Sequence, residues 1–500
     1  MIRRITDYLD LSAASFPHKI AFADDRREMS FEVLRHEAYQ VASALAGNQF
    51  FRRPIAIFMD KQPECVSAMM GVAYSGNYYT VLDVHMPVPR IEKIIDTLKP
   101  AAIITVSERA EAARNFVGKA ALLIYEELID HPADEELVNT AKNRVISSDV
   151  LYVLFTSGST GTPKGVIISH RAVIEYSEWL SEHFPLDENT VFGNQTPFYF
   201  VMSGLDIFQT IRNGCTTWII PRMAFMFPGM LLEYLMEHKI NTLYWVPSAL
   251  CLVANLGALS EIRLPELRLV MFGGEVMPTK QLNMWRAEYP NVMFVNQYGP
   301  TEMTDICAYY IVDRDIPDTE AIPIGKASEH MEILLLGEDD RPVSKGEIGE
   351  LCGRGPSLAY GYYNDPEKTA SAFVQNPLNQ EFPEKIYRTG DLVRINEHGE
   401  MVFVSRKDFQ IKHMGHRIEL GEIEAAASSL EGIDRSCCLY DNERSKIVLF
   451  YTGTITETEI KNRLRALIPE YMIPNKTIRL DSMPMNLNGK IDRAGLKACL

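Results

Sequence analysis

Three turns rich in glycine and polar residues follow directly on apolar runs, and they are the part of the chain best suited to chemistry. The runs and the turns that follow them are VLYVLF with TSGSTGTPKG (150–165), LRLVMF with GGE (267–275) and NVMFVN with QYGPTE (291–302). In open parallel sheets, ligands bind in the crevice outside the carboxyl ends of the strands. If the apolar runs are such strands, the three turns together predict one ligand site.

The first turn has the composition of a polyphosphate-binding loop. Within ten residues it holds three glycines together with Thr156, Ser157, Ser159, Thr160 and Lys164. Glycines let backbone N–H groups approach phosphate oxygens, hydroxyls add donors, and the lysine adds a positive charge. The turn is not a Walker A loop, because Pro163 stands where that motif has its second glycine and Gly165 follows the lysine. A solvated Ser/Thr/Gly loop is the alternative, which the apolar run directly before the turn disfavours.

The elements that would position these turns alternate along the chain. Apolar, β-branched runs predict strands at 55–59, 101–106, 150–155, 241–246, 267–272 and 291–296, with helical patterns between them at 228–238 and 279–289. This alternation predicts an α/β fold with largely parallel sheets. After residue 320, closely spaced strands and glycine turns predict a smaller β-rich subdomain. After Asp408, short strands and a helix opened by Thr456 predict a final unit.

The charge of the chain argues against nucleic acid as a partner. Among 500 residues, 50 Lys and Arg stand against 66 Asp and Glu, a formal net charge of −16, whereas proteins that bind phosphate backbones present basic surfaces. From residue 409 onward, 13 basic residues stand against 12 acidic ones, so the acidity lies in the first four-fifths of the chain. Either this is chance variation, or the less acidic C-terminal part meets an anion or an acidic partner.

The cysteines and the apolar runs bear on the cellular compartment. Eight cysteines are scattered without CxxC pairs, which predicts reduced thiols and no zinc site. The N-terminal stretch has no apolar signal core, and no apolar run is long enough to span a bilayer. We therefore expect a cytoplasmic, monomeric protein with no membrane segment.

Five motifs together resemble a known family. In chain order they are TSGSTGTPKG, QYGPTE, YRTGD (387–391), RKDFQIKHMGHRIELGEIE (406–424) and NGKIDR (488–493). This series resembles the adenylate-forming superfamily of acyl-CoA synthetases, luciferases and peptide-synthetase adenylation domains, and the resemblance covers nearly the whole chain. Because of NGKIDR, FGGEVMP (272–278) and NQTPF (194–198), the chain looks most like stand-alone D-alanine-carrier protein ligases and amino-acid adenylation domains.

The resemblance implies a domain organisation. A large N-terminal domain, 1–407, would consist of layered α/β subdomains and would include the β-rich subdomain at about 320–407. A small, mobile α+β domain would follow at 408–500, with the hinge at Asp408. After rotation about this hinge, the segment from Lys412 to Gly415 would line the tunnel used in thiolation.

The resemblance also implies a reaction in two halves. The carboxylate of an acid attacks the α-phosphate of ATP and expels pyrophosphate, and a thiol then attacks the acyl-adenylate and expels AMP. Lys164, Lys490 and Glu302 would be catalytic, because cations must neutralise the charge that grows on the phosphates. Glu302 would bind Mg²⁺. For Lys490 taken alone, a solvated lysine in a glycine turn is the alternative reading.

The ATP site carried over from the family includes one residue for each part of the nucleotide. Asp391 would accept both ribose hydroxyls, Arg406 would add a ribose or phosphate contact, and Tyr298 would pack on the adenine. Taken alone, Asp391 could instead be a turn or helix-capping residue. The full set is Thr156, Ser157, Gly158, Ser159, Thr160, Gly161, Lys164, Gly274, Glu275, Asn296, Tyr298, Gly299, Thr301, Asp391, Arg406 and Lys490.

The acyl pocket is where the chain departs from the family. Members that activate α-amino acids usually carry an aspartate at the position of Val201, and that carboxylate pairs with the substrate ammonium. A desolvated ammonium without a partner is costly, so Val201 predicts an acid without an α-ammonium, such as an aryl or hydroxy acid. Gln297 or Asp305 could then meet a ring hydroxyl or a remote amine, whereas Asp206 is expected to be structural. The pocket set is Phe200, Val201, Met202, Leu205, Trp245, Met271, Gly273, Gln297, Asp305 and Ile306.

The expected function is that of an AMP-forming acid–thiol ligase with ATP and Mg²⁺ as cofactors. It would adenylate a small carboxylic acid and load it on the phosphopantetheine thiol of a separate carrier protein, because no carrier-like segment with a modifiable serine follows NGKIDR. Three alternatives stay open: a ligase for D-alanine or another amino acid, an acyl- or aryl-CoA synthetase, and a non-catalytic nucleotide-binding protein. The retained Lys164, Glu302, Asp391 and Lys490 disfavour the last.

Overall fold

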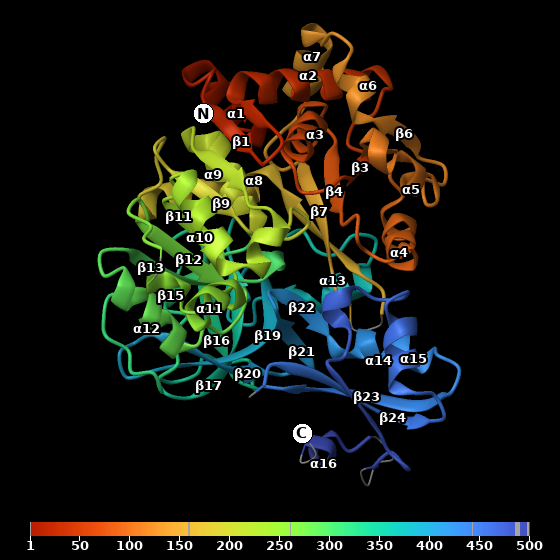
Figure 1. Ribbon diagram of the computed structural model, residues 1–500, viewed down its shortest axis with the longest axis vertical. Helices are drawn as coiled ribbons and strands as arrows, with labels where there is room; N and C mark the ends of the chain where they lie inside the picture. The colour runs from red at the N-terminus through yellow and green to blue at the C-terminus, as the bar shows by residue number, and fades with distance from the viewer. Residues whose placement is uncertain (1, 159–160, 261, 443, 486–490, 498–499) are drawn as a thin grey trace. The chain divides into compact units, whose positions relative to one another are not determined.

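A computed structural model describes residues 2–158, 161–260, 262–442, 444–485, 491–497 and 500 (Figure 1). The chain forms two compact units. The first unit consists of Met1–Asp83, Lys99–Leu154 and Gly165–Lys407, and the second of Val84–Leu98, Phe155–Lys164 and Asp408–Leu500. The glycine-rich loop after residue 155 therefore belongs to the second unit, together with the C-terminal residues.

The N-terminal part of the chain builds a six-stranded sheet. Its strand order is β6 (Ala121–Ile124), β5 (Ala102–Thr105), β3 (Pro54–Phe58), β4 (Tyr78–Leu82), β7 (Val150–Thr156) and β8 (Lys164–Ser169). The pairs from β6 to β7 are parallel. The helices of this region are α1 (Ile5–Ser15), α2 (Phe31–Gly47), α3 (Pro63–Tyr74), α4 (Val88–Leu98), α5 (Ala110–Arg114), α6 (Tyr125–Ile129) and α7 (Glu135–Asn143).

A nine-stranded sheet follows, with a parallel centre and antiparallel edges. Its order is β15 (Lys326–Ala327), β14 (Ala308–Ile311), β13 (Met293–Tyr298), β12 (Leu269–Gly273), β11 (Thr242–Trp245), β9 (Val191–Asn194), β10 (Thr216–Ile219), β1 (Ile20–Ala23) and β2 (Glu28–Ser30). Its helices are α8 (His170–His183), α9 (Ser203–Asn213), α10 (Pro228–Glu237), α11 (Pro247–Asn255) and α12 (Thr279–Glu288).

The remaining sheets are smaller. In the first unit, β16 (Glu332–Leu336), β17 (Ile348–Arg354), β18 (Phe373–Gln375), β19 (Lys385–Ile395) and β20 (Met401–Arg406) form a five-stranded antiparallel sheet beside α13 (Pro366–Ala372). In the second unit, β21 (Gln410–His413) pairs with β22 (His416–Glu419), and β23 (Ile433–Asp441), β24 (Lys446–Gly453) and β25 (Lys476–Arg479) form a three-stranded sheet. Its helices after residue 408 are α14 (Leu420–Ser428), α15 (Glu457–Leu464) and α16 (Arg493–Lys497).

The elements predicted from sequence are confirmed. All six predicted strands and both predicted helices are present, and the mixed α/β fold class holds. Thr456 caps α15 by accepting from the backbone N–H of Glu459, and Lys461 pairs with Glu457 one turn away at 3.0 Å. Pro63 opens α3, where a missing N–H costs nothing.

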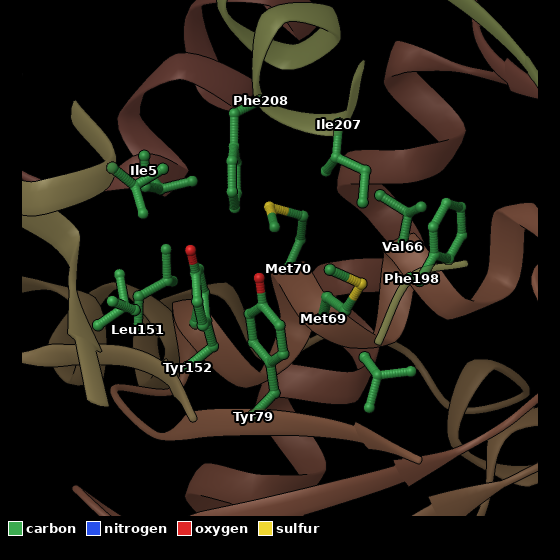
Figure 2. Packing of buried hydrophobic residues seen from close by; sticks show 14 of the residues in the cluster. Ile5, Val66, Met69, Met70, Tyr79, Leu151, Tyr152, Phe198, Ile207 and Phe208 are labelled. Atoms are coloured by element: carbon green, nitrogen blue, oxygen red, sulfur yellow. The ribbon is translucent and has the colours of Figure 1, made fainter. Parts of the chain in front are cut away.

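Apolar packing joins α3 to α9 in the first unit. Figure 2 shows Ile207 and Phe208 of α9 facing Val66 and Met70 of α3, with Tyr152 of β7 beside them. All five side chains are buried, and each such burial stabilises by roughly 1.5–3 kcal/mol. This packing holds the end of β3 close to the segment that leads into α9.

The structure bears on two expectations from the sequence, those about the cysteines and about membrane-spanning segments. Seven cysteines of the described residues are free, and all of them except Cys251 are buried. Burial raises the pKa of Cys215 and of Cys352 to about 12. Across the same residues, no helix combines the length and the apolar character that crossing a bilayer demands.

Candidate active site

A fixed carboxylate lies where β19 and β20 pair. Asp391 is opposite Arg406 in the register, and Arg406 Nη1 donates to Asp391 Oδ1 at 2.5 Å. The hydroxyl of Tyr298, at the end of β13, donates to Asp391 Oδ2. Tyr298 stays protonated, because burial first, and then the charge of Asp391, raises its pKa well above the usual value. Each carboxylate oxygen keeps a further lone pair, so the group can still accept a pair of vicinal hydroxyls such as those of a ribose.

A second buried carboxylate follows β13 in the short helix η4 (Thr301–Met303). Glu302 is fully buried, and its Oε1 accepts from the hydroxyl of Tyr362 at 2.7 Å. Mg²⁺ is usually bound in proteins through one or two carboxylates together with substrate phosphates. Glu302 therefore fits the predicted magnesium ligand. Within the described ranges, no three His, Cys, Asp or Glu side chains gather as a metal site.

The turn between β13 and β14 depends on glycine. A Cβ on Gly299 would lie 2.0 Å from the carbonyl oxygen of Asp305, so no larger residue fits without moving the turn. Thr304 and Asp305 both have positive φ, at 53° and 78°, and Cys307 N–H closes the hairpin on Tyr298 O at 2.9 Å. The turn therefore fixes both Glu302, which lies shortly before this strained pair, and Asp305, which is its second residue.

The predicted acyl pocket is apolar around one carboxylate. Asp305 is buried, and its Oδ2 accepts from the hydroxyls of Tyr176 at 2.8 Å and Tyr244 at 3.1 Å. Trp245 follows Tyr244 in the chain and Ile306 follows Asp305, and both are fully buried. Asp305 does not begin a helix, because its φ of 78° lies outside the helical region.

The segment that carries Val201 turns into α9. Phe200 N–H bonds to Pro197 O at 3.0 Å and Ser203 N–H bonds to Phe200 O at 3.1 Å, which places Val201 in a tight turn before the helix. Val201 is half-buried and packs against the same apolar cluster as Ile207. The position that would carry an ammonium-binding aspartate is thus filled by a hydrocarbon side chain. Met202 and Leu205 of the pocket set are buried on the same segment.

Gly273 and Gln297 face one another across β12 and β13. A Cβ on Gly273 would lie 2.6 Å from Gln297 O, so the glycine is needed for strand pairing there. Gln297 donates weakly to the sulfur of Met271 at 3.2 Å, and its buried Oε1 has no hydrogen-bond partner among the described residues. Gln297 can therefore still accept from a ligand in the pocket.

Two side chains of the predicted ATP-binding set form hydrogen bonds to backbone atoms. Glu275 Oε2 accepts from Ser248 N–H at 3.1 Å, and Asn296 Nδ2 donates to Pro323 O at 2.8 Å. Both bonds hold loops that follow strands of the nine-stranded sheet. Gly274, directly before Glu275, has φ of +85°, where a side chain would be strained.

In the second unit, the glycine-rich loop contacts residues from the other two segments of that unit, Val84–Leu98 and Asp408–Leu500. Ser157 Oγ donates to Arg417 O at 2.6 Å, and Lys93 Nζ donates to Gly161 O at 3.0 Å. A Cβ on Gly158 would lie 2.1 Å from Thr162 O, so the loop folds tightly on itself. Two predicted loop residues, Ser159 and Thr160, lie outside the described residues. Thr156 ends β7 and Lys164 begins β8.

The predicted hinge and thiolation residues also belong to the second unit. Asp408 Oδ1 accepts from Gln410 N–H at 3.1 Å, which forms a turn directly before β21. Lys412 lies in β21, and Gly415, with φ of +78°, makes the turn to β22. Arg90 of α4 and Glu422 of α14 form a buried ion pair within the same unit. Lys490 lies outside the described residues.

The three strands that lead into the predicted turns belong to two different sheets. β12 and β13 are adjacent and parallel in the nine-stranded sheet, whereas β7 belongs to the six-stranded sheet. Apolar runs of this kind predict that a segment is a buried strand, but they carry no information on which sheet it joins.

Sequence reasoning expected Asp206 to be structural and did not connect it with the buried polar cluster at the end of β9. Lys61 Nζ donates to Asn194 O at 3.2 Å and Gln195 O at 3.0 Å, and Asn194 Nδ2 donates to Asp206 Oδ2 at 2.7 Å. The available signal was a single lysine three residues after an apolar strand and a single aspartate within the apolar face of a helix.

Comparison with known proteins identifies the family. The profile described as AMP-binding enzyme matches residues 9–363. The chain is 30% identical over 503 residues to an L-proline--[L-prolyl-carrier protein] ligase of Pseudomonas fluorescens, covering 97% of each protein. It is 30% identical to a D-alanine--D-alanyl carrier protein ligase of Lacticaseibacillus casei, covering 100% of this chain and 99% of that one. It is also 31% identical to a mycosubtilin synthase of Bacillus subtilis, and this alignment covers 96% of this chain but only 18% of the synthase.

A solved structure shows the same fold. The structure of holo-PA1221, described as an NRPS protein containing adenylation and PCP domains, matches with a TM-score of 0.86 at 23% identity, covering 99% of this chain and 84% of that one. From the family match over residues 9–363 and the near-complete alignment to relatives at 30% identity, the chain belongs to the AMP-binding enzyme family and is an AMP-forming ligase that uses ATP.

Proposed function

We propose that the protein adenylates a small carboxylic acid that lacks an α-ammonium group and transfers it to the phosphopantetheine thiol of a separate carrier protein. The observation that carries the choice of acid is Val201, a hydrocarbon side chain in contact with the apolar core where relatives that take α-amino acids usually have an aspartate. Two relatives aligned along nearly their whole length are carrier-protein ligases by name, which supports a carrier as the acceptor.

The proposed reaction has two bond exchanges. First, a carboxylate oxygen of the acid attacks the α-phosphorus of ATP, and the bond to pyrophosphate breaks with pyrophosphate keeping the electron pair. Second, the thiolate sulfur of the carrier attacks the acyl carbon, and the bond to AMP breaks with AMP keeping the electron pair. The thiol proton is released to solvent when the thiolate forms. Catalysis in both steps depends on positioning and on charge stabilisation.

The side chains of this protein divide the tasks. Asp391 would accept the ribose hydroxyls and so set the position of the nucleotide, with Arg406 and Tyr298 holding its two oxygens in place. Lys164 and Lys490 would neutralise charge on the phosphates. Glu302 would hold Mg²⁺, which supplies further neutralisation when bound, and the hydroxyl of Tyr362 orients that carboxylate.

The buried and free cysteines support a cytoplasmic location, where thiols stay reduced, and we propose that the protein acts there as a monomer. The hinge at Asp408 and the thiolation residues Lys412 and Gly415 belong to the same proposal, because the two half-reactions need different groups near the acyl carbon. Turns of the kind seen at Asp408 and Gly415 are suited to changes in backbone direction.

Pyrophosphate exchange over a panel of acids tests the proposal. The panel contains aryl acids, hydroxy acids, β-amino acids and L- and D-α-amino acids, and the best acid is then offered a holo-carrier protein or coenzyme A. We expect exchange with an acid that lacks an α-ammonium, and loading of the carrier in preference to coenzyme A. A clear preference for L- or D-alanine would overturn the proposed class of acid. AMP release with coenzyme A alone would overturn the proposal that a carrier protein is the acceptor.

Replacement of Val201 separates the role of this residue from that of the rest of the pocket. Val201→Asp should weaken binding of the native acid by about tenfold or more, because the variant buries a charge without a partner. The same variant should admit an α-amino acid. Val201→Asn is the matched control, with nearly the same shape and no charge, and should not admit the α-amino acid. If both variants behave alike, charge at this position does not select the substrate.

A further inference from the structure

The polar cluster of Lys61, Asn194 and Asp206 contains acceptor atoms without donors. Asp206 is 1% exposed and Asn194 is fully buried. Asn194 Nδ2 donates to Asp206 Oδ2, but Asp206 Oδ1 and Asn194 Oδ1 have no hydrogen-bond partner among the described residues. Buried polar atoms in native proteins are nearly always paired with protein, water or ligand. Two unpaired acceptors on side chains that are hydrogen-bonded to each other therefore point to a donor that is not part of the described residues.

The cluster adjoins the proposed acyl pocket. Asp206 follows the pocket residue Leu205 directly in α9, and Asn194 ends β9, whose Gly193 carbonyl accepts from the pocket residue Trp245 at 2.7 Å. The charge of Asp305, also in the pocket set, acts on Asp206 and contributes to its raised pKa. The two carboxylates are thus close enough to influence each other's ionisation.

Burial acts strongly on the two ionisable groups of this cluster. Lys61 is the cation acting on Asp206, and its ammonium donates to two backbone carbonyls, of Asn194 and Gln195. Burial raises the pKa of Asp206 to about 7 and lowers the pKa of Lys61 to about 7. A cationic group on a ligand beside Asp206 would stabilise the ionised form of that carboxyl.

We infer that Asp206 is a specificity-determining residue, and that the acid carries a protonated amine away from its carboxyl group, which donates to Asp206 Oδ1 and Asn194 Oδ1. This inference rests on the proposed function, since it concerns the acid of that reaction. An ammonium has three donors and one positive charge, so it can donate to both acceptors and pair with the carboxylate of Asp206. The substrate class is then that of β- or γ-amino acids or of amino-substituted aryl acids.

The position of the amine explains Val201. An α-ammonium would lie beside the carboxyl group, at the part of the pocket that relatives cover with aspartate, and here that part is apolar. Asp206 lies on α9, beyond Val201 in the chain, and α9 is fixed against α3 by the apolar contacts in Figure 2. The absence of a carboxylate at Val201 and the unpaired acceptors of Asp206 and Asn194 together fit an acid whose amine is not on the α-carbon.

Matched pairs of acids test the inference on the unmodified protein. The pairs are benzoate with 3-aminobenzoate, propionate with 3-aminopropionate, and butyrate with 4-aminobutyrate, each measured by pyrophosphate exchange. We expect the amino member of at least one pair to exceed its partner in kcat/KM by about tenfold or more, because a buried charge pair is costly to leave incomplete. If the best acid of a full panel carries no amine, the inference is wrong, and the acceptors are satisfied by a buried water.

The variant Asp206→Asn assigns the effect to this residue. It should bring the ratio of kcat/KM within the preferred pair close to one, while kcat/KM for the amine-free acid changes less than about threefold. An equal fall for both members would mean a structural role and would overturn the inference. Glu37→Gln is the matched control, a buried carboxylate bound by Arg27 and Tyr125 in the N-terminal region, and it should leave the ratio unchanged.

Two further measurements keep the result interpretable. If thermal unfolding shows that Asp206→Asn is not folded, Asn194→Ser replaces it, because the shorter side chain withdraws one acceptor and keeps Asp206; the same loss of the ratio is expected, and an unchanged ratio would contradict the inference. If no acid supports exchange, the proposed function fails. If amine-free acids support exchange best, only the inference fails.

Discussion

At the scale of single residues, Asp391, the proposed ribose ligand, is a buried carboxylate whose two oxygens are both held in place. Arg406 and Tyr298 each hold one of its oxygens, and the three residues come from two different sheets. Because both oxygens are already oriented, binding a nucleotide does not require the carboxylate to be ordered at that moment. The bond from the tyrosine is charge-assisted, which makes it stronger than one between neutral groups.

Tyr298→Phe should therefore raise the KM for ATP by about tenfold or more, since a hydrogen bond to a charged group contributes roughly 1.5–3 kcal/mol. The KM for the acid should stay nearly constant. Pyrophosphate exchange at varied ATP and then at varied acid measures the two constants. Tyr310→Phe is the control, because the buried hydroxyl of Tyr310 has no hydrogen-bond partner among the described residues. Equal effects of the two variants would show that the bond to Asp391 is not used.

The sequence predicted single residues where motifs carry them and missed those that depend on distant contacts. Asp391 and Arg406 follow from YRTGD and RKDF, and the register of β19 and β20 pairs them. The bond from Tyr298 joins residues 93 apart in the chain and on different sheets, which no local pattern encodes. For the same reason the sequence did not link Lys61 with Asp206, which it treated as structural: the hydrogen bonds of Asn194 join them only in the folded chain.

At the scale of elements, the turn from β13 to β14 positions two carboxylates through its backbone. Gly299 lies against the carbonyl of Asp305, and two residues with positive φ follow η4. A change in this turn would displace Glu302 and Asp305 together. The turn thus couples the proposed metal ligand to the acyl pocket by covalent geometry alone.

Gly299→Ala should lower exchange activity by about a hundredfold or more while the protein stays folded, because the new Cβ must push the turn away from Asp305 O and misplacement of reacting groups is costly. Thermal unfolding and exchange activity are measured on the same preparation. Gly229→Ala serves as the control, since a Cβ there meets nothing within 4 Å. An active Gly299→Ala variant would show that the turn tolerates the shift.

The positions of helices and strands were predictable from local sequence patterns. The partners of each strand were less predictable, because they are distant in the sequence. The runs at 55–59 and 291–296 are strands as expected, and the pattern after Thr456 forms α15. The assignment of β7 and β13 to different sheets could not be predicted, because strand partners are chosen by packing among many similar apolar runs.

At the scale of the whole molecule, the chain separates into two compact units, and the glycine-rich loop belongs to the second. The sequence suggested a simple division at Asp408, whereas the second unit also includes Val84–Leu98 and Phe155–Lys164. The buried pair of Arg90 and Glu422 and the bond from Ser157 to Arg417 O account for this grouping.

The role proposed for Lys490 predicts a selective defect. Lys490→Ala should abolish formation of the acyl-adenylate and largely spare the attack of a thiol on preformed acyl-adenylate, because only the first half-reaction places negative charge on the departing phosphates. The two half-reactions are measured separately, by pyrophosphate exchange and by thioester formation from synthetic acyl-adenylate. Lys497→Ala, an exposed lysine in α16, is the control. Equal loss in both assays would reject the assignment.

The pH dependence of stability should reflect His170, the first residue of α8. It is 1% exposed, its Nδ1 accepts from Ile5 N–H at 3.2 Å, and burial lowers its pKa to about 4 from the ordinary 6.5. The unfolded chain therefore takes up a proton below pH 6.5 while the folded protein does not until about pH 4. Stability from this residue is complete above pH 6.5 and falls by up to about 1.4 kcal/mol for each pH unit on the way down to 4.

His170→Asn keeps an acceptor and removes the titration, so its unfolding free energy should depend less steeply on pH between 6.5 and 4. Chemical denaturation at several pH values gives the slope. His18→Asn is the control, because the His18 side chain is 88% exposed, and it should leave the slope unchanged. A slope in His170→Asn equal to that of the unmodified protein would mean that other groups dominate in this range.

The burial of the cysteines has a consequence for an enzyme that makes an activated acyl group. Acyl-adenylates react with thiolates, and a thiolate on the enzyme itself would compete with the intended acceptor. Cys65, Cys215, Cys307, Cys352, Cys437 and Cys438 are buried, and burial raises the pKa of Cys437 to about 11 and of Cys215 to about 12. All six sulfurs are buried, and the raised pKa keeps the thiols of Cys215 and Cys437 protonated at neutral pH. Self-acylation at these six positions is thereby suppressed, and the activated acyl group is preserved for a thiol brought from outside.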